Sequence, residues 1–261
     1  GNDLVKFSII VENTGSGATG AFDVVVKATL PAGFKIPTGS PGLNLQVTDG
    51  TGTALAYTGT PTDLFGTGIQ LVDPGATTGS LSAGNPSSGT NTSGTNIAVI
   101  TYDLQLTPNV VPLDKITNTA TLTNYAAVEG GPNFLPPAGL TDKTDVIIRS
   151  PAVTKTLVGT SIVDAWNSDK QAVIGELVTY DLSVKVPQGT TPAAVLTDTF
   201  TDALGFVRVV GSPTVDTGVN VSGLANINSP TLTQNGTVAE WQLGDIVNSN
   251  TDDQLHGITF R

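Results

Sequence analysis

The sequence predicts an all-β fold in which β-sandwich domains follow one another along the chain. Three observations predict it: an internal repeat of domain length, a composition rich in β-branched residues and turn formers, and short runs in which apolar and polar residues alternate. The 261 residues are 38% hydrophobic, which is enough to fill two separate cores. Thr, Ser, Asn and Val are abundant, and 30 Gly and 16 Pro residues supply the turns between short strands.

The internal repeat divides the chain into two domains. Segments of the first half return about 172 residues later. The matching pairs are Leu4–Gly15 with Leu177–Gly189, Leu30–Phe34 with Asp202–Phe206, and Ile100–Asp103 with Ile258–Arg261. One strand pattern ends and the next begins near Ser150, so we expect domains at residues 1–149 and 150–261, joined by a short linker.

Each domain is expected to be incomplete at one end. Residues 150–174 lead into the second copy and have no counterpart before Gly1, so the first domain lacks its opening strand. The second copy stops where the first still has about 45 residues to run, so it lacks its closing strand. Two explanations stay open: the sequence is part of a longer tandem array, or neighbouring subunits supply the strands by β-augmentation.

Strand signals dominate the first domain. Residues 5–11 alternate between apolar and polar side chains and are followed by a turn at Asn13-Thr-Gly15. The Asp49-Gly50 dipeptide marks a tight turn, because both residues tolerate the positive φ that such turns need. The strands expected from these signals are 5–11, 22–30, 43–48, 54–57, 68–72, 97–106, 116–125 and 144–148. The polar residues 74–96 and the Pro-rich residues 132–137 are expected to be loops.

The second domain repeats the same signals. Its strongest amphipathic strand is expected at 175–186, and no run of ten residues has a helical pattern. The strands expected here are 152–158, 175–186, 194–201, 206–210, 240–246 and 256–261. Seven or more short strands separated by turns are typical of a β-sandwich.

Composition excludes several classes of function. The net charge of −11 repels phosphate backbones, so we expect no nucleic-acid partner. Cysteine is absent, which excludes disulfides, zinc-thiolate sites and a cysteine nucleophile. No apolar run is long enough for membrane insertion in this stretch of sequence. The lone histidine, His256, has no Gly-x-Ser-x-Gly motif beside it, so we expect no catalytic triad and no enzyme.

The run Gly175–Val184, with Val153-Thr-Lys155 before it and Thr197–Asp202 after it, resembles bacterial conserved-repeat domains known as domain of unknown function eleven. It is also similar to the fimbrial isopeptide-forming domains. Asp3–Gly15, Leu30–Gly33 and Ile116–Leu122 match the same pattern in the first copy. The resemblance implies tandem immunoglobulin-like β-sandwich domains, strung along large secreted proteins of the bacterial cell surface.

The resemblance also implies a candidate crosslink, because some relatives join their first and last strands by a lysine-to-asparagine amide bond assisted by a buried acid. Lys155 would be the nucleophile of the second domain and Glu176 its acid. Asn118 would be the acceptor of the first domain and Asp3 its acid. Neither domain holds all three partners in this sequence. The alternative is an exposed lysine, a carboxylate at a strand edge and an asparagine beside a turn.

Carboxylates of the second domain form a candidate calcium site. Asp198 and Asp202 lie on one face if their segment is extended, and Asp164 or Asp169 can complete the oxygen ligands that Ca²⁺ prefers. The alternative is that these aspartates cap loops and turns. No other cofactor is expected.

These observations favour a non-catalytic structural module of a repetitive extracellular protein, from a surface layer, stalk, fibre or adhesin. Its partners would be neighbouring repeats or copies of the same protein, with assembly by strand complementation as one route. The alternative is an adhesive module that binds a cell-surface glycan through polar loops or through Trp166 and Trp241.

Overall fold

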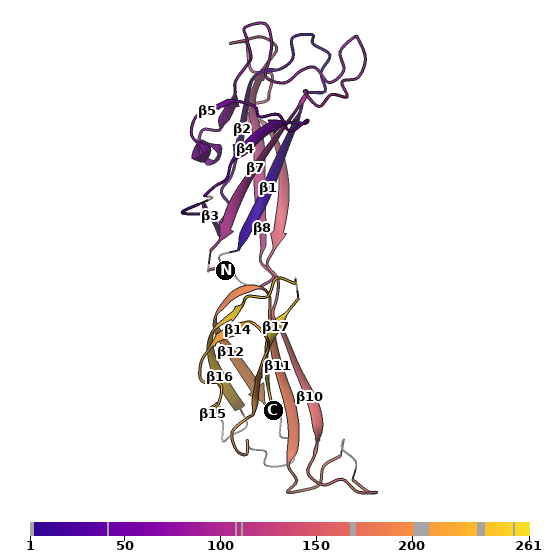
Figure 1. Cartoon of the computed structure of the whole chain (residues 1–261), viewed down its shortest axis with the longest axis vertical. Helices are drawn as coiled ribbons and strands as arrows, with labels where there is room; N and C mark the ends of the chain where they lie inside the picture. The colour runs from indigo at the N-terminus through magenta and orange to yellow at the C-terminus, as the bar shows by residue number, and fades with distance from the viewer. Residues whose placement is uncertain are drawn as a thin grey trace. The chain divides into compact units, whose positions relative to one another are not determined.

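The computed structural model describes residues 3–40, 42–107, 109–110, 112–167, 171–200, 209–233, 238–252 and 254–261. The chain divides into two compact units, which we call the N-terminal unit (Asp3–Val110 with Asp114–Ile148) and the C-terminal unit (Arg149–Arg261). Both are built from antiparallel strands (Figure 1). Within the described ranges the one helical element is η1 (Pro61–Phe65), a single 3-10 turn. The predicted all-β fold is confirmed.

The N-terminal unit contains two antiparallel sheets. The first has the order β1-β7-β3, and β4 also pairs with β7; its strands are β1 (Leu4–Glu12), β3 (Phe34–Lys35), β4 (Gln46–Asp49) and β7 (Ile97–Leu106). The second has the order β5-β6-β2-β8-β9, with β2 (Phe22–Ala28), β5 (Tyr57–Thr58), β6 (Ile69–Leu71), β8 (Lys115–Ala126) and β9 (Leu140–Ile147).

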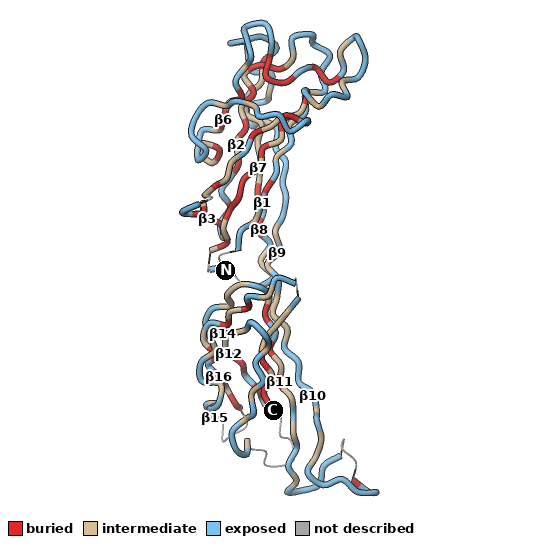
Figure 2. Tube along the Cα trace, in the orientation of Figure 1, coloured by how far each residue is buried: buried red, intermediate tan, exposed pale blue. Residues whose placement is uncertain are grey.

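The core of the N-terminal unit forms where the two sheets face each other. Alternate side chains of β2 are buried along its whole length, as its period-two sequence predicts. In the other sheet, Phe7 stacks on Tyr102 with 5.6 Å between ring centroids, and Phe34 meets Phe7 edge-on at 5.5 Å. The buried segments alternate with exposed ones along the strands (Figure 2).

The C-terminal unit also has two antiparallel sheets. One has the order β10-β11-β17-β13, with β10 (Ala152–Thr160), β11 (Val178–Val186), β13 (Val215–Thr217) and β17 (His256–Phe260). The other has the order β12-β16-β14, and β15 also pairs with β16; its strands are β12 (Gly189–Thr199), β14 (Val221–Leu224), β15 (Thr231–Thr233) and β16 (Val238–Asn248). Trp241 and Phe260, whose ring centroids are 5.3 Å apart, lie at the centre of the core.

The pairing registers of the two units correspond in the β2 and β12 sheets. Val25 of β2 lies opposite Gln70 of β6, and Val195 of β12 lies opposite Gln242 of β16. The residues around the two glutamines also match, as Ile69-Gln-Leu71 and Trp241-Gln-Leu243. Strand β12 therefore takes the place of β2, and β16 takes the place of β6.

The opposite sheets correspond as well, but not in the register that the sequence match suggested. Ile9 matches Leu182 in the repeat of Leu4–Gly15 and Leu177–Gly189; Ile9 lies opposite Ile100, and Leu182 lies opposite Phe260. Phe260 therefore takes the place of Ile100, whereas the match of Ile100–Asp103 with Ile258–Arg261 put it in the place of Tyr102. That match was wrong by two residues, a shift that keeps the same side chains facing the core and so leaves the alternation pattern unchanged.

Each unit has a strand that the other lacks among the described residues. Strand β2 lies between β6 and β8, whereas β12 pairs with β16 alone. Strand β11 lies between β10 and β17, whereas β1 pairs with β7 alone. In the described chain, one side of β12 and one side of β1 are thus sheet edges.

Several short strands were missed or misplaced by the sequence. The strand expected at 54–57 is only β5 and an isolated bridge at Ala54. The strand expected at 206–210 lies mostly outside the described residues, and its last two residues are not in a strand. Strands β13, β14 and β15 were not expected, because their few, largely exposed residues give no alternation signal.

Both units contain the same kind of bulge, near the start of β2 and within the first half of β12. Asp23 has a φ of 52°, and its amide donates to Asp73 at 3.1 Å. Ala193 has a φ of 47°, and its amide donates to Asp245 at 2.8 Å. Both accepting aspartates end a Gln-Leu-x-Asp sequence, at residues 70–73 and 242–245. This aspartate holds a left-handed residue that lets the strand bend onto its neighbour.

We expect Ala193→Gly to raise the free energy of unfolding of the C-terminal unit by about 1 kcal/mol, because glycine adopts the left-handed conformation without a Cβ clash. Ala194→Gly, one residue further along, should instead lower it by about 1 kcal/mol, because glycine costs backbone entropy there and the Ala194 methyl group, which packs against the core, is lost. Urea denaturation of both variants checks this. Loss of stability in both would show that residue 193 is not strained.

Candidate functional site

A partly buried ion pair joins the two sheets of the C-terminal unit. Lys155, on β10, donates from Nζ to both carboxylate oxygens of Asp198, on β12, at 2.8 and 3.0 Å. The ammonium also lies 4.6 Å from the ring centroid of Tyr180 and 4.8 Å from that of Phe200. The amine is therefore held by one carboxylate and two aromatic faces.

Solvent reaches the two partners unequally. The side chain of Asp198 is 9% exposed, and that of Lys155 is 34% exposed. A carboxylate so far removed from water needs a cation beside it, because the charge has lost most of its hydration. Lys155 supplies that cation and still has one open side toward solvent.

The acid beside Lys155 is Asp198, whereas the sequence analysis named Glu176. Lys155 lies opposite Leu182 in the β10–β11 ladder, and Glu176 precedes Leu182 by six residues. Glu176 lies in the loop before β11, which begins at Val178, so the strand that faces Lys155 does not carry Glu176. The sequence alone cannot reveal the cross-sheet neighbour, since Lys155 and Asp198 are 43 residues apart.

Glu176 instead organises the loop between β10 and β11. Its carboxylate accepts hydrogen bonds from the amides of Ile162 at 2.6 Å and Val173 at 2.9 Å, and from the side chain of Asn167 at 3.0 Å. Burial alone would raise the pKa of Glu176, but these hydrogen bonds outweigh it and the pKa is lowered. The carboxylate is thus kept ionised, which is unsuited to an acid that must be protonated.

Asn118 lies in the core of the N-terminal unit. It is 4% exposed, its Nδ2 donates to the hydroxyl of Tyr102 at 2.7 Å, and its Oδ1 has no hydrogen-bond partner among the described residues. Burial raises the pKa of Tyr102, so the phenol stays protonated near neutral pH. The amide is therefore held rigidly and retains one free acceptor atom.

Asp3, the acid expected beside Asn118, lies elsewhere along β1. Tyr102 faces Phe7, and Asp3 precedes Phe7 by four residues, which is about 13 Å of extended chain. Burial raises the pKa of Asp3. The structure therefore does not bring Asp3 to the Asn118 amide. The residue that corresponds to Asp198 in this unit is Ala28, which carries no acid.

The aspartates expected to bind calcium have other roles where they are described. Asp198 holds the ammonium of Lys155, which takes the position of a cation. Asp164 accepts hydrogen bonds from the amides of Trp166 at 2.8 Å and Asn167 at 2.9 Å, the turn-capping role that was the alternative. Asp169 and Asp202 lie outside the described residues.

A different acidic cluster, in the N-terminal unit, was not found from the sequence. Oxygens of Asp23, Asp73 and Glu129 lie within 4.8 Å of one another. Asp73 also accepts from the amide of Ser80 at 2.7 Å, and Asp23 accepts from that of Gly130 at 2.9 Å. Burial makes the largest contribution to a raised pKa of Glu129, and the negative charges of Asp23 and Asp73 raise it further. The bulge explains why the two aspartates lie close together, because the Asp73 carboxylate accepts a hydrogen bond from the backbone amide of Asp23.

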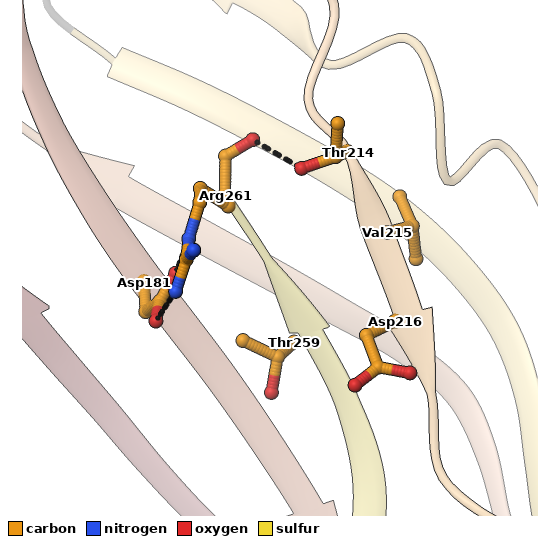
Figure 3. Close-up of a pocket in the computed structure, with 6 residues that line it drawn as sticks. All are labelled: Asp181, Thr214, Val215, Asp216, Thr259 and Arg261. Carbon is orange, nitrogen blue, oxygen red and sulfur yellow. Dashed lines mark hydrogen bonds and ion pairs between the residues drawn. The ribbon is translucent and has the colours of Figure 1, made fainter. Parts of the chain in front are cut away.

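A polar cavity of about 450 Å³ lies on the sheet formed by β11, β17 and β13. Arg261 makes a two-pronged ion pair with Asp181, both contacts at 2.7 Å, and lies between Asp181 and Thr214 (Figure 3). The hydrogen bonds from Arg261 lower the pKa of Asp181. Arg261 is thus already paired, and Asp216 adds a second carboxylate to the lining.

The two tryptophans have opposite environments. Trp241 is 4% exposed and packs in the core, so it is not available to stack on a sugar. Trp166 is 92% exposed, on the loop that Glu176 organises. Of the two tryptophans, Trp166 is therefore the one that remains for the glycan-binding alternative, beside the polar loops.

Comparisons with known proteins give weak likenesses only. No family model matches the chain, and no curated protein matches it. The C-terminal domain of the AgI/II polypeptide BspA of Streptococcus agalactiae is 12% identical, with a TM-score of 0.31 over 99% of this chain and 82% of that one.

The pilus backbone protein RrgB of Streptococcus pneumoniae is 14% identical, with a TM-score of 0.28 over 99% of this chain and 43% of that one. TM-scores this low do not establish a common fold, so the fold assignment depends on the strand pairing described above. In the described part of the chain, no helix is both long and apolar enough to cross a bilayer.

We expect Lys155→Met to destabilise the C-terminal unit by roughly 1–3 kcal/mol, because Asp198 would be left almost buried without a cation. The double variant Lys155→Met with Asp198→Leu should recover most of that loss. Lys185→Met, an exposed lysine on β11, is the matched control and should change little. Thermal unfolding of the four proteins checks this, and equal losses in the single and double variants would contradict it.

We expect Glu129→Gln to stabilise the N-terminal unit at pH 7. The folded-state pKa of Glu129 is raised above its ordinary value of 4.5, so the ionised carboxylate destabilises the fold at neutral pH. That penalty falls away as the pH drops through the raised pKa and vanishes below about 4.5. Urea midpoints of the two proteins should therefore differ at pH 7 and converge near pH 4. A difference that does not depend on pH would contradict this.

Proposed function

We propose that this chain is a structural, non-catalytic module of a repetitive extracellular protein on a bacterial surface, such as a stalk, fibre, adhesin or surface layer. The observation that carries the proposal is the Lys155–Asp198 pair. The pair joins β10, the first strand of the C-terminal unit, to β12 in the opposite sheet. Because β10 is the first strand after the link between the units, a pulling force that passes along the chain would act on it.

The strand pairing supports a load-bearing role. All nine residues of β1 pair in antiparallel register with β7, and β10 pairs with β11 from Ala152 to Thr160 with one bulge. Force along such a strand acts on many perpendicular hydrogen bonds at once, because antiparallel ladder bonds run across the strand axis. The cross-sheet ion pair adds a tie between β10 and β12 that the backbone ladder does not supply.

The sheet edges support assembly by strand complementation. In the described chain, β12 has a free side where β2 is covered by β8, and β1 has a free side where β11 is covered by β10. A strand supplied by a neighbouring repeat or by another copy would satisfy the backbone groups on these edges. Partners of this module would then be units of its own kind.

A covalent crosslink at Lys155 extends the same role. Transfer of one proton from Lys155 to Asp198 would produce a neutral amine and a protonated acid together, the forms that attack and activation require. The Nζ atom would then attack the Cγ atom of an asparagine on an incoming strand, with the acid donating to the amide oxygen. The new C–N bond replaces the C–NH₂ bond, and ammonia leaves. In this scheme Asp198 takes the role first given to Glu176.

We expect Lys155→Met to lower the force at which the C-terminal unit unfolds when the whole chain is stretched from its two ends in a single-molecule experiment. The tie between sheets is then lost while the β10–β11 ladder remains. Lys185→Met should keep the wild-type force. If wild-type units extend at forces no higher than those of the Lys155→Met variant, the load-bearing role is wrong.

A further inference from the structure

The loop between β10 and β11 has the reverse of the usual burial pattern. In its described part, residues 161–167 and 171–177, the buried residue is Asn167 and the partly buried one is Glu176, and both are polar. Large apolar side chains are exposed instead, namely Ile162, Val163, Trp166, Val173, Ile174 and Leu177. The tube beyond the ends of β10 and β11 is accordingly mostly pale blue (Figure 2). Such a loop presents to water the side chains that water solvates least, so its arrangement suits apolar surroundings.

A tight turn places Trp166 at one corner of the loop. Asp164 and Asn167 exchange backbone hydrogen bonds at 2.9 and 3.3 Å. The Asp164 carboxylate also accepts from the amides of Trp166 and Asn167 at 2.8 and 2.9 Å. The turn is therefore closed by its own polar groups and does not use the indole for packing, and the indole is left almost fully exposed.

A second turn places Ile174 at another corner. The amide of Glu176 donates to the carbonyl of Val173 at 3.1 Å, and Gly175 has a φ of 87°, which glycine adopts without strain. The Ile174 side chain is fully exposed. The Glu176 carboxylate accepts from the amide of Val173 at 2.9 Å and from the side chain of Asn167 at 3.0 Å. It therefore holds the two turns together.

The polar side chains of the two turns are used by the loop itself. Asp164 and Glu176 accept from backbone amides. Asn167 donates to the carbonyl of Ile162 at 2.8 Å and to Glu176. A sugar needs hydrogen-bonding groups around the aromatic ring on which it stacks, and these three side chains are already occupied. The corners therefore fit a hydrocarbon better than a glycan.

Shape and charge favour a lipid surface as that hydrocarbon. Trp166 and Ile174 project from two separate corners, so a soft apolar layer can surround both, whereas a pocket would hold one of them. Tryptophan prefers the boundary between lipid headgroups and acyl chains, where its ring is buried and its N–H is solvated. The charged residues of the described loop are Asp164 and Glu176, both acidic, so anionic headgroups are not attracted.

A second copy of the chain is a poorer fit for these corners. The cavity on the sheet of β11, β17 and β13 is lined mainly by charged and hydroxyl-bearing side chains. It is therefore no socket for an exposed indole or an isoleucine, because burying apolar groups there would also strip water from the polar lining.

We propose that the loop between β10 and β11 inserts Trp166 and Ile174 into the surface of a zwitterionic lipid bilayer, at the boundary between headgroups and acyl chains. The loop enters one leaflet and does not span the bilayer, since each corner is only a few residues long. Binding follows the apolar area that leaves water and depends little on salt. The inference adds a lipid contact to the proposed structural role and does not depend on that role.

Phosphatidylcholine vesicles mixed with the whole chain test the proposal. We expect co-sedimentation that saturates with lipid, a blue shift of the tryptophan emission, and quenching of that emission by lipids brominated on their acyl chains. The change reports Trp166, because Trp241 is buried in the core and already shielded from water. Ile174→Ser should weaken vesicle binding about fivefold or more, because less apolar area then leaves water.

Val219→Ser is the matched control, since Val219 is an exposed valine on a turn of the same unit outside this loop. It should leave vesicle binding unchanged. Absence of vesicle binding, or equal binding by wild type and Ile174→Ser, overturns the inference. Tighter binding to vesicles that contain phosphatidylglycerol, lost at high salt, also overturns it, because charge would then dominate.

Self-association of the chain in place of vesicle binding, abolished by Ile174→Ser, would assign the loop to a second copy and overturn the lipid contact. A chain that resists force but does not bind vesicles would retain the proposed function and lose this inference alone.

Discussion

The constraint on which this molecule depends is that each strand must bury one face of side chains and satisfy its backbone on both sides. The first requirement places two sheets face to face in each unit, with β2 and β7 in one core and β12 and β17 in the other. Backbone groups are hydrogen-bonded on both sides in the inner strands of each sheet, whereas edge strands have one side without a neighbouring strand. Among the described residues, β1 and β12 each pair with one strand and form sheet edges.

The Lys155–Asp198 pair is notable because the core around it is apolar. An ion pair in such a place costs hydration and adds little net stability compared with hydrophobic residues of similar size. Its position between β10 and β12 gives the charge another use, because it ties the two sheets together. The tie between the sheets and the candidate crosslink are thus two aspects of one contact.

Comparison of the two units separates what they share from what differs. Both hold a left-handed bulge residue with an aspartate from the neighbouring strand, Asp73 in one and Asp245 in the other. The N-terminal unit adds Glu129 to that aspartate, and its charge raises the electrostatic cost of the site. The C-terminal unit replaces the alanine at position 28 by Asp198 and thereby gains the partner of Lys155.

The sequence by itself determined the all-β fold, the alternation of the long strands and Lys155 as a residue of the candidate site, because these follow from local patterns and residue types. Only the tertiary structure decided which acid faces Lys155, since Asp198 reaches it from the opposite sheet while Glu176 lies in the loop before β11. The short strands β13 to β15 and the two-residue register of Phe260 were likewise decided by pairing. A period of two cannot distinguish a register from one shifted by two residues, so partner strands had to fix it.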